Sequence, residues 1–405
     1  MARVRPFRAV RPRADIAAEI CDLPYDVMSA DEARQMAEGR PWSFLRVSRP
    51  EIGFAGRVDP GSELVYKSAA EQFRRMLKEG VLYRDDRACY YLYRQVMGQH
   101  QQVGWVGLAS CNDYLEGVIK RHELTRPDKE ADRMRHLESV GAQTGPAFLI
   151  HPADSGLRSI ARKRLETGPA ANFVAADGVG HSAWVISDEE EIGEVERAFR
   201  RMPALYIADG HHRSAAAVGI YRKRGMAAEA GGFLSVIFPD DQVRILPYHR
   251  VVKDLNGLTV DGFMGRLEGA AEVSRGGSPV PAGRGEVSIY AGGTWWRMRW
   301  RDSSGEGSDA VEGLDVSRLQ QQVLAPVLGI ADPRTSDRIG FIGGIRGTGE
   351  LERLVDRGEY AAAFSMHPTE VKQLMAVADA GGVMPPKSTW FEPKLRDGMF
   401  CHLYE

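Results

Sequence analysis

The residues most able to do chemistry lie together between Ala204 and Ala217, where an apolar run ends in Asp-Gly-His-His-Arg and an alanine-rich segment follows. This order predicts a strand over 204–208, a tight turn and a helix start, with the polar side chains gathered in the turn. The first N–H groups of a helix lack intrahelical partners, and with the helix dipole they attract anions. The planar guanidinium of Arg213 could add a doubly donating contact to phosphate. An ordinary turn with exposed histidines is the weaker interpretation, because few such turns are so densely polar.

A second polar cluster covers residues 120–133 and reads KRHELTRPDKEADR. Glu123 is a candidate base there, and it precedes a helix expected over 128–140. Thr125 and Pro127 fit the start of that helix. Lys129 and Arg133 on its outer face are candidate anion contacts. The alternative is a solvated charged face, which is what most charge runs are.

Two further clusters lie toward the C-terminus. Pro247-Tyr248-His249-Arg250 ends an apolar run, and residues 384–396 read MPPKSTWFEPKLR. The prolines, lysines and hydroxyl groups of the second cluster suggest a rigid loop that closes over an anionic ligand. A proline-rich surface tail is the alternative. The candidate anion contacts from these two clusters are His249, Arg250, Lys387, Ser388 and Lys394.

Several common signatures are missing from the sequence. It has no P-loop, no HExxH zinc motif and no GxSxG nucleophile elbow. The glycine-rich segment 343–349 lacks the complete GxGxxG order, so we do not expect a dinucleotide site there. The adjacent pair His211 and His212, without spaced partners, is a weak metal signal.

Composition places the chain among ordinary globular proteins and excludes some partners. Its 405 residues are 43% hydrophobic and 27% charged, and 53 Lys and Arg against 55 Asp and Glu give a net charge of −2. This balance gives no overall attraction to nucleic acid or to a membrane surface. Four scattered cysteines, with no CxxC pair, suit a reducing compartment. The sequence has neither an apolar leader nor a membrane-length apolar run, so we expect a cytoplasmic location.

Helix and strand patterns interleave along the chain, which predicts an α/β or mixed α+β fold. We expect two domains, over residues 1–255 and 256–405. The expected helices cover 62–79, 128–140, 188 to just before Pro203, 316–328, 349–357 and 368–380. The expected strands cover 88–93, 103–109, 146–150, 184–186, 204–208, 233–238, 244–250, 287–290, 295–300, 339–342 and 361–364, and a loop is expected over 301–312.

Taken together, these segments make the chain similar to domain-of-unknown-function family 1015 over nearly its whole length. The matching pieces, in order, are PYDV at 24–27, HELTRPDKEADR at 122–133, YIADGHHRSAAA at 206–217, LPYHR at 246–250 and MPPKSTWFEPK at 384–394. The third piece also resembles the phosphate-binding box of the ParB/sulfiredoxin superfamily. The resemblance implies a ParB/sulfiredoxin-like core with a large insertion and a C-terminal α/β region. The chain lacks an obvious helix-turn-helix and the cysteine that sulfiredoxin chemistry needs, so neither of those roles is expected.

Within that superfamily, the free-serine kinases carry a similar Asp-Gly-His-x-Arg turn, which Asp209, Gly210, His211 and Arg213 match. The resemblance implies a nucleotide-dependent phosphotransferase acting on a small hydroxyl substrate, with free L-serine as the best candidate. It implies ATP or ADP as the nucleotide, with CTP as an alternative, and Mg²⁺ bound at Asp209. We expect Glu123, Asp209, His211 and His212 to be the catalytic residues, and Gly210, His211, His212, Arg213 and Ser214 to be the phosphate contacts in the turn.

Two other functions stay open at this point. The same site could hydrolyse a substrate such as phosphoserine, with His211 or His212 as acid and base. It could also be a non-catalytic module that senses CTP or ATP. The expected partners are a nucleotide and a small molecule rather than nucleic acid or a membrane, and the chain could form an oligomer.

Overall fold

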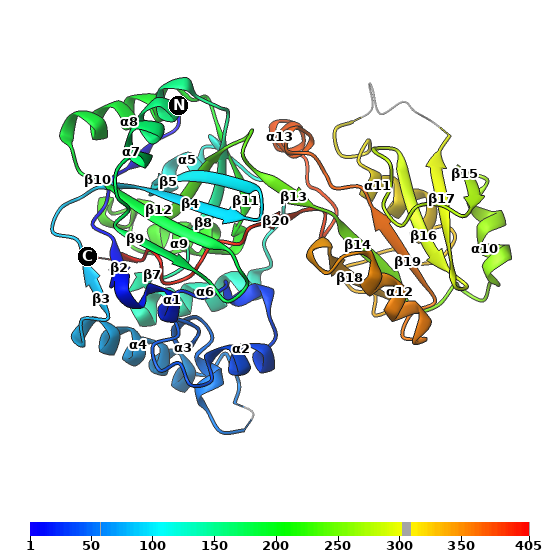
Figure 1. Ribbon diagram of the computed structural model, residues 1–405, viewed down its shortest axis with the longest axis horizontal. Coiled ribbons are helices and arrows are strands. Elements are labelled where there is room, and N and C mark those ends of the chain that lie inside the picture. The colour runs from blue at the N-terminus through cyan, green and yellow to red at the C-terminus, as the bar shows by residue number, and fades with distance from the viewer. Residues whose placement is uncertain (57, 302–308, 405) are drawn as a thin grey trace. The chain divides into compact units, whose positions relative to one another are not determined.

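The computed structural model describes residues 1–56, 58–301 and 309–404. By its internal contacts the chain divides into two compact units, which Figure 1 shows. Unit 1 comprises residues 1–243 and 393–405, and unit 2 comprises residues 244–392. Both units combine helices with largely antiparallel sheets, so the fold is mixed α+β as expected. Among the described residues, no helix is long and apolar enough to cross a membrane.

Unit 1 is built on a mixed nine-stranded sheet. The strand order is β6-β11-β8-β12-β5-β4-β10-β9, and β1 also pairs with β5. The pairs β6–β11 and β8–β12 are parallel and the others antiparallel. These strands are β1 (Val4–Arg5), β4 (Tyr90–Met97), β5 (His100–Ser110), β6 (Ile119–Lys120), β8 (Ala147–His151), β9 (Ala171–Val174), β10 (Gly180–Ile186), β11 (Leu205–Asp209) and β12 (Gly232–Pro239).

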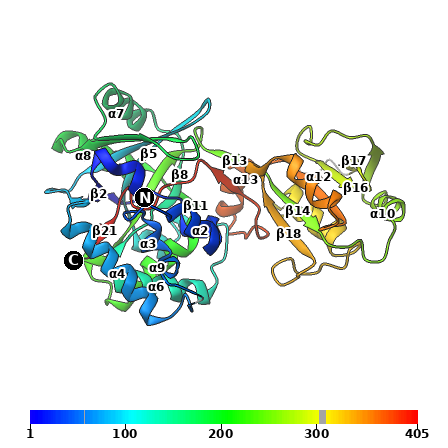
Figure 2. The same ribbon diagram turned by 60° about the horizontal axis from the view of Figure 1, so that its bottom comes forward.

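Helices cover both sides of this sheet. Figures 1 and 2 both show α7 and α8 together on one side and α3, α4 and α6 on the other. The central strands β8 and β12 are buried along their whole length, as a sheet covered on both faces requires. The helices of unit 1 are α1 (Ala17–Ile20), α2 (Ala30–Ala37), α3 (Leu45–Ser48), α4 (Glu63–Lys78), α5 (Cys111–Leu115), α6 (Pro127–Val140), α7 (Ser155–Leu165), α8 (Glu189–Arg201) and α9 (His211–Lys223).

Two of these helices, α6 and α9, pack directly on each other. Gly219 of α9 faces Met134 of α6 so closely that an added Cβ would lie 2.6 Å from the methionine sulfur. A glycine at this point lets the two helix axes approach. The contact holds the segment with Glu123, which precedes α6, close to the Asp-Gly-His-His-Arg turn, where α9 begins.

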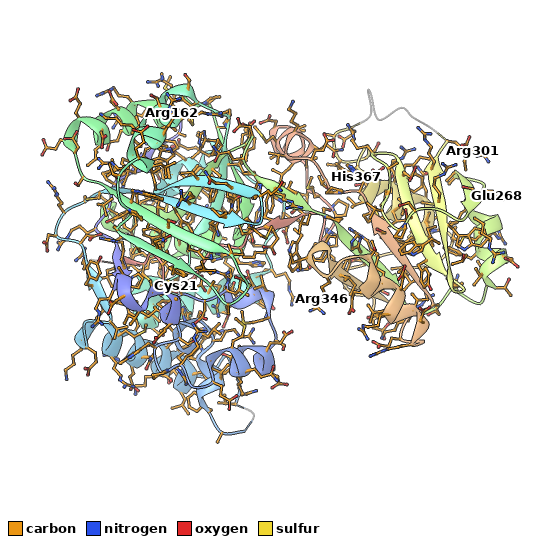
Figure 3. All side chains as sticks on the ribbon, in the orientation of Figure 1. Cys21, Arg162, Glu268, Arg301, Arg346 and His367 are labelled. Carbon is orange, nitrogen blue, oxygen red and sulfur yellow. The ribbon has the colours of Figure 1, made fainter. Side chains whose placement is uncertain are left out.

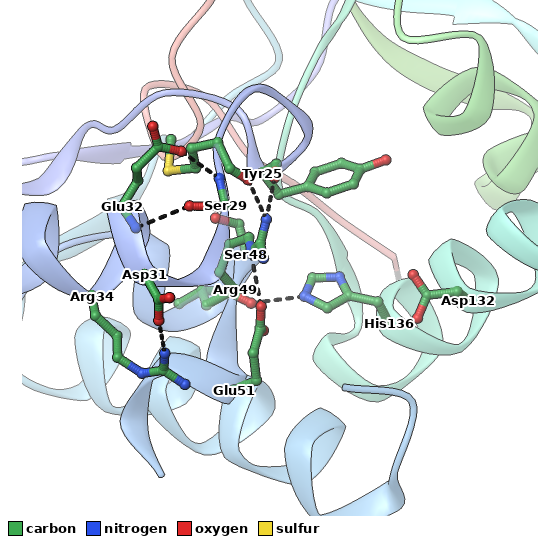
Figure 4. A network of polar contacts seen from close by, with 12 residues as sticks. Tyr25, Ser29, Asp31, Glu32, Arg34, Ser48, Arg49, Glu51, Asp132 and His136 are labelled. Carbon is green, nitrogen blue, oxygen red and sulfur yellow. Dashed lines mark hydrogen bonds and ion pairs between the residues drawn. The ribbon is translucent and has the colours of Figure 1, made fainter. Parts of the chain in front are cut away.

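The N-terminal segment of unit 1 is fixed by a polar network, which Figure 4 shows. Ser29 and Glu32 form a capping box at the start of α2. The Arg49 guanidinium donates to the carbonyl oxygens of Tyr25 and Met28, at 2.8 and 2.7 Å, and pairs with Glu51 at 2.8 Å. This network holds the Tyr25-Asp26 turn in place beside Arg213 of α9.

The C-terminal residues 393–405 return to unit 1. Strand β21 (His402–Leu403) pairs with β7 (Ala142–Gln143), and Cys401 forms a bridge with Val10. Val10 belongs to β2 (Val10–Pro12), which pairs with β3 (Leu82–Arg84). The four cysteines are buried and form no disulfide. In Figure 3 the labelled Cys21 lies inside unit 1, whereas the labelled Arg162 of α7 is exposed.

Unit 2 contains an antiparallel six-stranded sheet in the order β15-β17-β16-β19-β14-β18. A separate two-stranded ribbon, β13 (Arg244–Leu246) with β20 (Trp390–Glu392), joins the beginning and the end of the unit. The strands of the sheet are β14 (Tyr248–Val252), β15 (Ala271–Arg275), β16 (Glu286–Ala291), β17 (Thr294–Trp300), β18 (Ile339–Gly343) and β19 (Ala362–Met366). The helices are α10 (Val260–Leu267), α11 (Asp315–Leu319), α12 (Thr348–Asp356) and α13 (Val371–Asp379).

Most of the elements expected from the sequence are confirmed within a few residues, and two differ. The strand expected over 244–250 is interrupted at Pro247, which has no N–H for a ladder hydrogen bond, and forms β13 and β14 instead. The helix expected over 316–328 is only the short α11, continued by a π-helical turn at Gln320–Leu324. Residues 302–308 of the expected loop lie outside the described residues. The domain boundary expected after residue 255 stays a prediction.

Candidate functional site

The strand, turn and helix expected around Gly210 are confirmed as β11, Gly210 and α9. Pairing of β11 with β8 shifts register between Ile207 and Asp209, so a bulge lies immediately before the turn. Such bulges re-aim the side chains that follow them. Gly210 has a φ of 88°, and an added Cβ would lie 3.2 Å from Ala147 Cα and from Arg213 Nε. Both the backbone conformation and the close approach therefore require glycine.

Asp209 ends β11 and is held by positive charge. Its Oδ2 accepts a hydrogen bond from Lys394 Nζ at 2.9 Å, and its Oδ1 accepts one from the Gly210 N–H at 2.8 Å. The Arg213 guanidinium lies 3.9 Å from Oδ1. Burial alone would raise the pKa of Asp209, but Lys394 and Arg213 lower it well below its usual range. Asp209 is therefore ionised at neutral pH and is a weak base.

Arg213 is mostly buried beneath the turn. It donates to the carbonyl oxygen of Pro146 and lies 3.7 Å from the carboxylate of Asp26. Burial would lower the pKa of Arg213, but Asp26 and Asp209 raise it above its usual range. The guanidinium is thus a fixed positive charge at the start of α9.

A small cavity of about 30 Å³ lies behind Arg213 and is also lined by Tyr25, Arg133 and Asp397. A cavity of this size suits a water or two rather than a nucleotide. Asp397 is buried, and its Oδ1 has no hydrogen-bond partner within the described residues. Burial raises the pKa of Asp397 to about 7, against the lowering effect of Arg213.

The 122–126 segment meets the start of α9. A Glu123 carboxylate oxygen lies 3.9 Å from His211 Nδ1, and the His122 and His211 rings meet edge to face with centroids 4.6 Å apart. The Arg126 N–H donates to His212 Nε2 at 3.1 Å. Two of the four polar clusters identified in the sequence, residues 204–217 and 120–133, therefore converge at this turn. Lys394, from the fourth cluster over residues 384–396, joins them.

The histidines at this junction are neutral at physiological pH. Burial lowers the pKa of His122 to about 4. It also lowers the pKa of His211 well below its usual value, and that of His212 to a smaller degree. Glu123 differs from these histidines because its side chain is 50% exposed.

The other candidate residues of unit 1 are Ser214, Arg133 and Lys129, and the first two make contacts within the protein. Ser214 is fully buried, and its hydroxyl donates to the Gly210 carbonyl at 3.2 Å, which occupies its proton. Arg133 pairs with Asp132 at 2.7 Å and stacks over the Tyr25 ring at 4.1 Å. Lys129 is exposed on α6.

The remaining candidates belong to unit 2. His249 is buried and accepts a hydrogen bond from the Met366 N–H at 3.1 Å, and burial lowers its pKa to about 4. Arg250 is also buried, donates to the Tyr248 and Pro386 carbonyls, and has its pKa lowered to about 10 by burial. Lys387 lies 5.6 Å from the Tyr248 ring centre, and the Ser388 hydroxyl donates to the Pro385 carbonyl at 2.6 Å. The third and fourth sequence clusters thus meet each other within unit 2.

Sequence reasoning missed several residues of this site. Asp26 lies within the PYDV segment, which served only to identify the family, and His122 was passed over beside Glu123. Asp397 lies just beyond the Pro- and Lys-rich segment. In the sequence, only their position near a polar cluster pointed to these residues. Each is brought to the site by contacts between residues far apart in the chain, which no local pattern indicates.

The chain is a mixed α+β protein with a densely polar turn at the start of a largely buried helix. Residues 4–317 match the model of the family described as "Protein of unknown function (DUF1015)", and the chain belongs to this family. The expected family is confirmed. No curated protein sequence matches the chain.

Several solved structures are distantly similar to the chain. A mutant free serine kinase in complex with AMP is 15% identical, with 70% of this chain and 86% of that chain covered and a TM-score of 0.38. A conserved hypothetical protein from Pyrococcus furiosus is 16% identical, covering 72% and 92%, with a TM-score of 0.36. C-terminally truncated SbnI from Staphylococcus aureus is 12% identical, covering 72% and 85%, with a TM-score of 0.39. Likeness at this level does not define a function.

Proposed function

We propose that this protein is a nucleotide-dependent phosphotransferase that acts on a small hydroxyl substrate, with free L-serine as the best candidate. One observation carries the proposal: the carboxylate of Glu123 lies 3.9 Å from His211, at the first turn of α9. A carboxylate able to accept a proton is thereby next to a helix start able to bind phosphate. The Asp-Gly-His-x-Arg turn, which resembles that of free-serine kinases, supports the same reaction.

The start of α9 would hold the nucleotide phosphates. The N–H groups of His211, His212 and Arg213 occupy the first turn, where the helix geometry gives them no intrahelical partner. The helix dipole, the buried Arg213 and Lys394 add positive charge. Phosphoryl transfer depends mainly on such positioning and charge stabilisation, so this environment suits it.

Glu123 is the better proton acceptor of the two candidate carboxylates. Asp209 is held ionised by Lys394 and Arg213, and its low pKa makes it a poor base. Glu123 is half exposed and can reach a substrate from solvent. We therefore assign Asp209 to positioning Lys394 and Arg213, rather than to proton transfer.

Asp209 also fits poorly as a ligand of Mg²⁺. Both of its oxygens accept hydrogen bonds, from Lys394 and from the Gly210 N–H, and the Lys394 ammonium would repel a divalent cation. Mg²⁺ bound to the nucleotide would neutralise part of the phosphate charge. No step is assigned to it through Asp209.

The substrate hydroxyl oxygen forms a bond to the terminal phosphorus as the bond from phosphorus to the bridging oxygen breaks. The hydroxyl proton passes to Glu123, and the nucleotide leaves with one phosphate fewer. Proton transfer to a positioned carboxylate typically contributes about 10²–10⁴-fold to the rate.

A screen of donors against acceptors tests this function. The purified full chain is incubated with ATP, ADP or CTP and with L-serine, D-serine or L-threonine, and O-phosphorylated products are measured by mass spectrometry. We expect phosphoserine from L-serine and an adenine nucleotide. Absence of any phosphorylated product, together with no stabilisation of the protein against heat by any Mg-nucleotide, would contradict the proposal.

Two further measurements on the purified full chain separate the alternatives. Phosphate release from phosphoserine without nucleotide would indicate the hydrolase. CTP or ATP binding that changes assembly state without turnover would indicate the sensing module. The geometry does not favour the hydrolase, because His212 already accepts a hydrogen bond from the Arg126 N–H, and His211, with its lowered pKa, is neutral and a poor proton donor to a leaving group.

A further inference from the structure

The His122, Glu123 and His211 side chains form a cluster outside the roles assigned above. Each offers one ligand atom, and these atoms lie within 4.8 Å of one another. We propose that this cluster binds a divalent transition metal ion of the zinc class, at the edge of the phosphate-binding turn. The inference goes beyond the proposed function and does not require it.

The two histidines support this proposal because both are buried and each has a ring nitrogen without a hydrogen-bond partner in the described residues. His122 is 2% exposed and His211 is 5% exposed. Within the described residues, His122 Nδ1 and His211 Nε2 have no hydrogen-bond partner. A buried polar atom without a partner is destabilising, so two such nitrogens on adjoining rings call for an occupant.

The orientation of His122 is that of a metal ligand. Its ring is hydrogen-bonded to the backbone of Ile207, and since Nδ1 has no partner, the other nitrogen makes this bond. A proton fixed between that nitrogen and a carbonyl oxygen leaves the Nδ1 lone pair available. Metal-binding histidines are usually oriented in this way by a backbone carbonyl or a carboxylate.

The donor set selects the class of metal. Imidazole nitrogens favour Zn²⁺ and its neighbours in the first transition row, whereas Mg²⁺ prefers an all-oxygen site. Two histidines and one glutamate match the ligand set of catalytic zinc sites, which keep a further position open. Zinc bonds of about 2.0–2.2 Å require these ligand atoms to close by roughly 1 Å. Glu123 can supply that movement, because it is half exposed and lies in the coil between β6 and α6.

A metal here would sit beside the phosphate-binding turn rather than at Asp209. Its open position would face an oxygen ligand, such as water, a substrate hydroxyl or a phosphate oxygen. A carboxylate has two oxygens, so ligation through one leaves the other of Glu123 able to accept a hydrogen bond. A bound cation would stabilise the ionised carboxylate, so metal-bound Glu123 would be a weaker proton acceptor than free Glu123, and the two roles belong to different states of the site.

Metal titration of the full chain tests the inference. The protein is stripped with a chelator, and Co²⁺, Zn²⁺ and Mg²⁺ are titrated separately by calorimetry, without nucleotide or serine. We expect one equivalent of Co²⁺ or Zn²⁺ to bind and Mg²⁺ not to compete. The visible absorption of bound Co²⁺ reports nitrogen ligation. No binding of Co²⁺ or Zn²⁺ by the folded protein would overturn the proposal.

Matched variants locate the site. His211→Gln and Glu123→Gln should each weaken Zn²⁺ binding by about tenfold or more, since each removes a ligand. His212→Gln changes the neighbouring histidine, which lies outside the cluster, and should leave Zn²⁺ binding unchanged. Equal loss in His212→Gln and His211→Gln would overturn the assignment. Glu123→Gln alters an exposed side chain, so its result stands even if the buried histidine variants do not fold. Binding of Zn²⁺ without phosphotransfer would refute only the proposed function.

Discussion

At the scale of single residues, the pairing of Asp209 with Lys394 organises charge at the turn. Their side-chain atoms meet at 2.9 Å although the residues lie 185 positions apart. Both side chains are largely shielded from water, at 28% and 10% exposure, so the pair is screened less than a surface ion pair. Removing one partner leaves the other charge partly buried and unpaired, which is the costly case.

A double-mutant cycle measures this coupling. Asp209→Asn and Lys394→Met should each lower the free energy of unfolding. The loss in the double variant should be smaller than the sum of the two single losses, by about 0.5–3 kcal/mol. Urea unfolding provides the free energies. The exposed pair Arg126 and Asp128 is the control, with an expected coupling below about 0.5 kcal/mol. Equal coupling in the two pairs would refute the special role of Asp209.

Asp397 gives the protein a specific pH dependence. Burial raises the pKa of its carboxyl group to about 7, whereas an unfolded aspartate titrates near 3.9. Between these values the folded state binds more protons than the unfolded state, so this contribution to stability is present at low pH and is lost as pH rises to about 7.

Asp397→Asn removes this titration while keeping the shape of the side chain. Relative to the unaltered protein, the variant should gain stability with rising pH, by up to about 1.4 kcal/mol per pH unit between pH 4 and 7. Urea unfolding at pH 5, 6, 7 and 8 measures the difference between the two proteins. A difference that does not change with pH would show that Asp397 is ionised in the folded protein.

At the scale of elements, the turn depends on a glycine at the junction of β11 and α9. Gly210→Ala should cost about 1–2 kcal/mol from the left-handed backbone alone. Crowding against Ala147 and Arg213 adds to this cost. Gly225, after the other end of α9, is the matched control, because its φ is 66° and an added Cβ would meet nothing within 4 Å. If Gly210→Ala is no more destabilising than Gly225→Ala in urea, the close packing at the turn is not important for stability.

Local patterns predicted most elements because their causes are local. The helix over 128–140 ends at Gly141, whose φ of 72° is the left-handed cap expected of a glycine there. The strand, turn and helix around Gly210 were predicted from the abrupt change in polarity. The same local reasoning failed at Pro247, where one missing N–H divides an apolar run into two strands.

The convergence of the site could not be predicted from local patterns. The pairing of Asp209 with Lys394, the approach of Glu123 to His211 and the burial of Asp397 all join residues far apart in the chain. Sheet order and helix packing determine such contacts, and neither has a periodic sequence signal. The same reason explains why Lys387, in a proline-rich segment with Lys394, belongs to a different unit.

At the scale of the whole molecule, unit 2 lies within the chain of unit 1. Arg244 and Glu392 are direct partners in the β13–β20 ribbon, so the two ends of unit 2 are neighbouring strand ends, about 5 Å apart. A Gly-Ser-Gly linker can therefore join Val243 to Pro393. The large apolar core and nine-stranded sheet of unit 1 are complete without residues 244–392.

We expect the shortened chain to fold cooperatively and to bind Zn²⁺ as the full chain does. Circular dichroism during heating measures the first property and calorimetry the second. Nucleotide binding by the shortened chain would show that His249, Arg250, Lys387 and Ser388 are not required for it. Aggregation of this chain under conditions where the full chain is folded would contradict the independence of unit 1.

The proposed function depends on Glu123 accepting the proton of a hydroxyl substrate at the start of α9. The most direct test is the rate of phosphoserine formation by Glu123→Gln, compared with Glu130→Gln, which changes a nearby glutamate on α6 outside the proposed proton transfer. We expect a loss of about 10²-fold or more in kcat for Glu123→Gln, with nucleotide binding retained, and little change for Glu130→Gln. Equal rates for Glu123→Gln and the unaltered protein would contradict it.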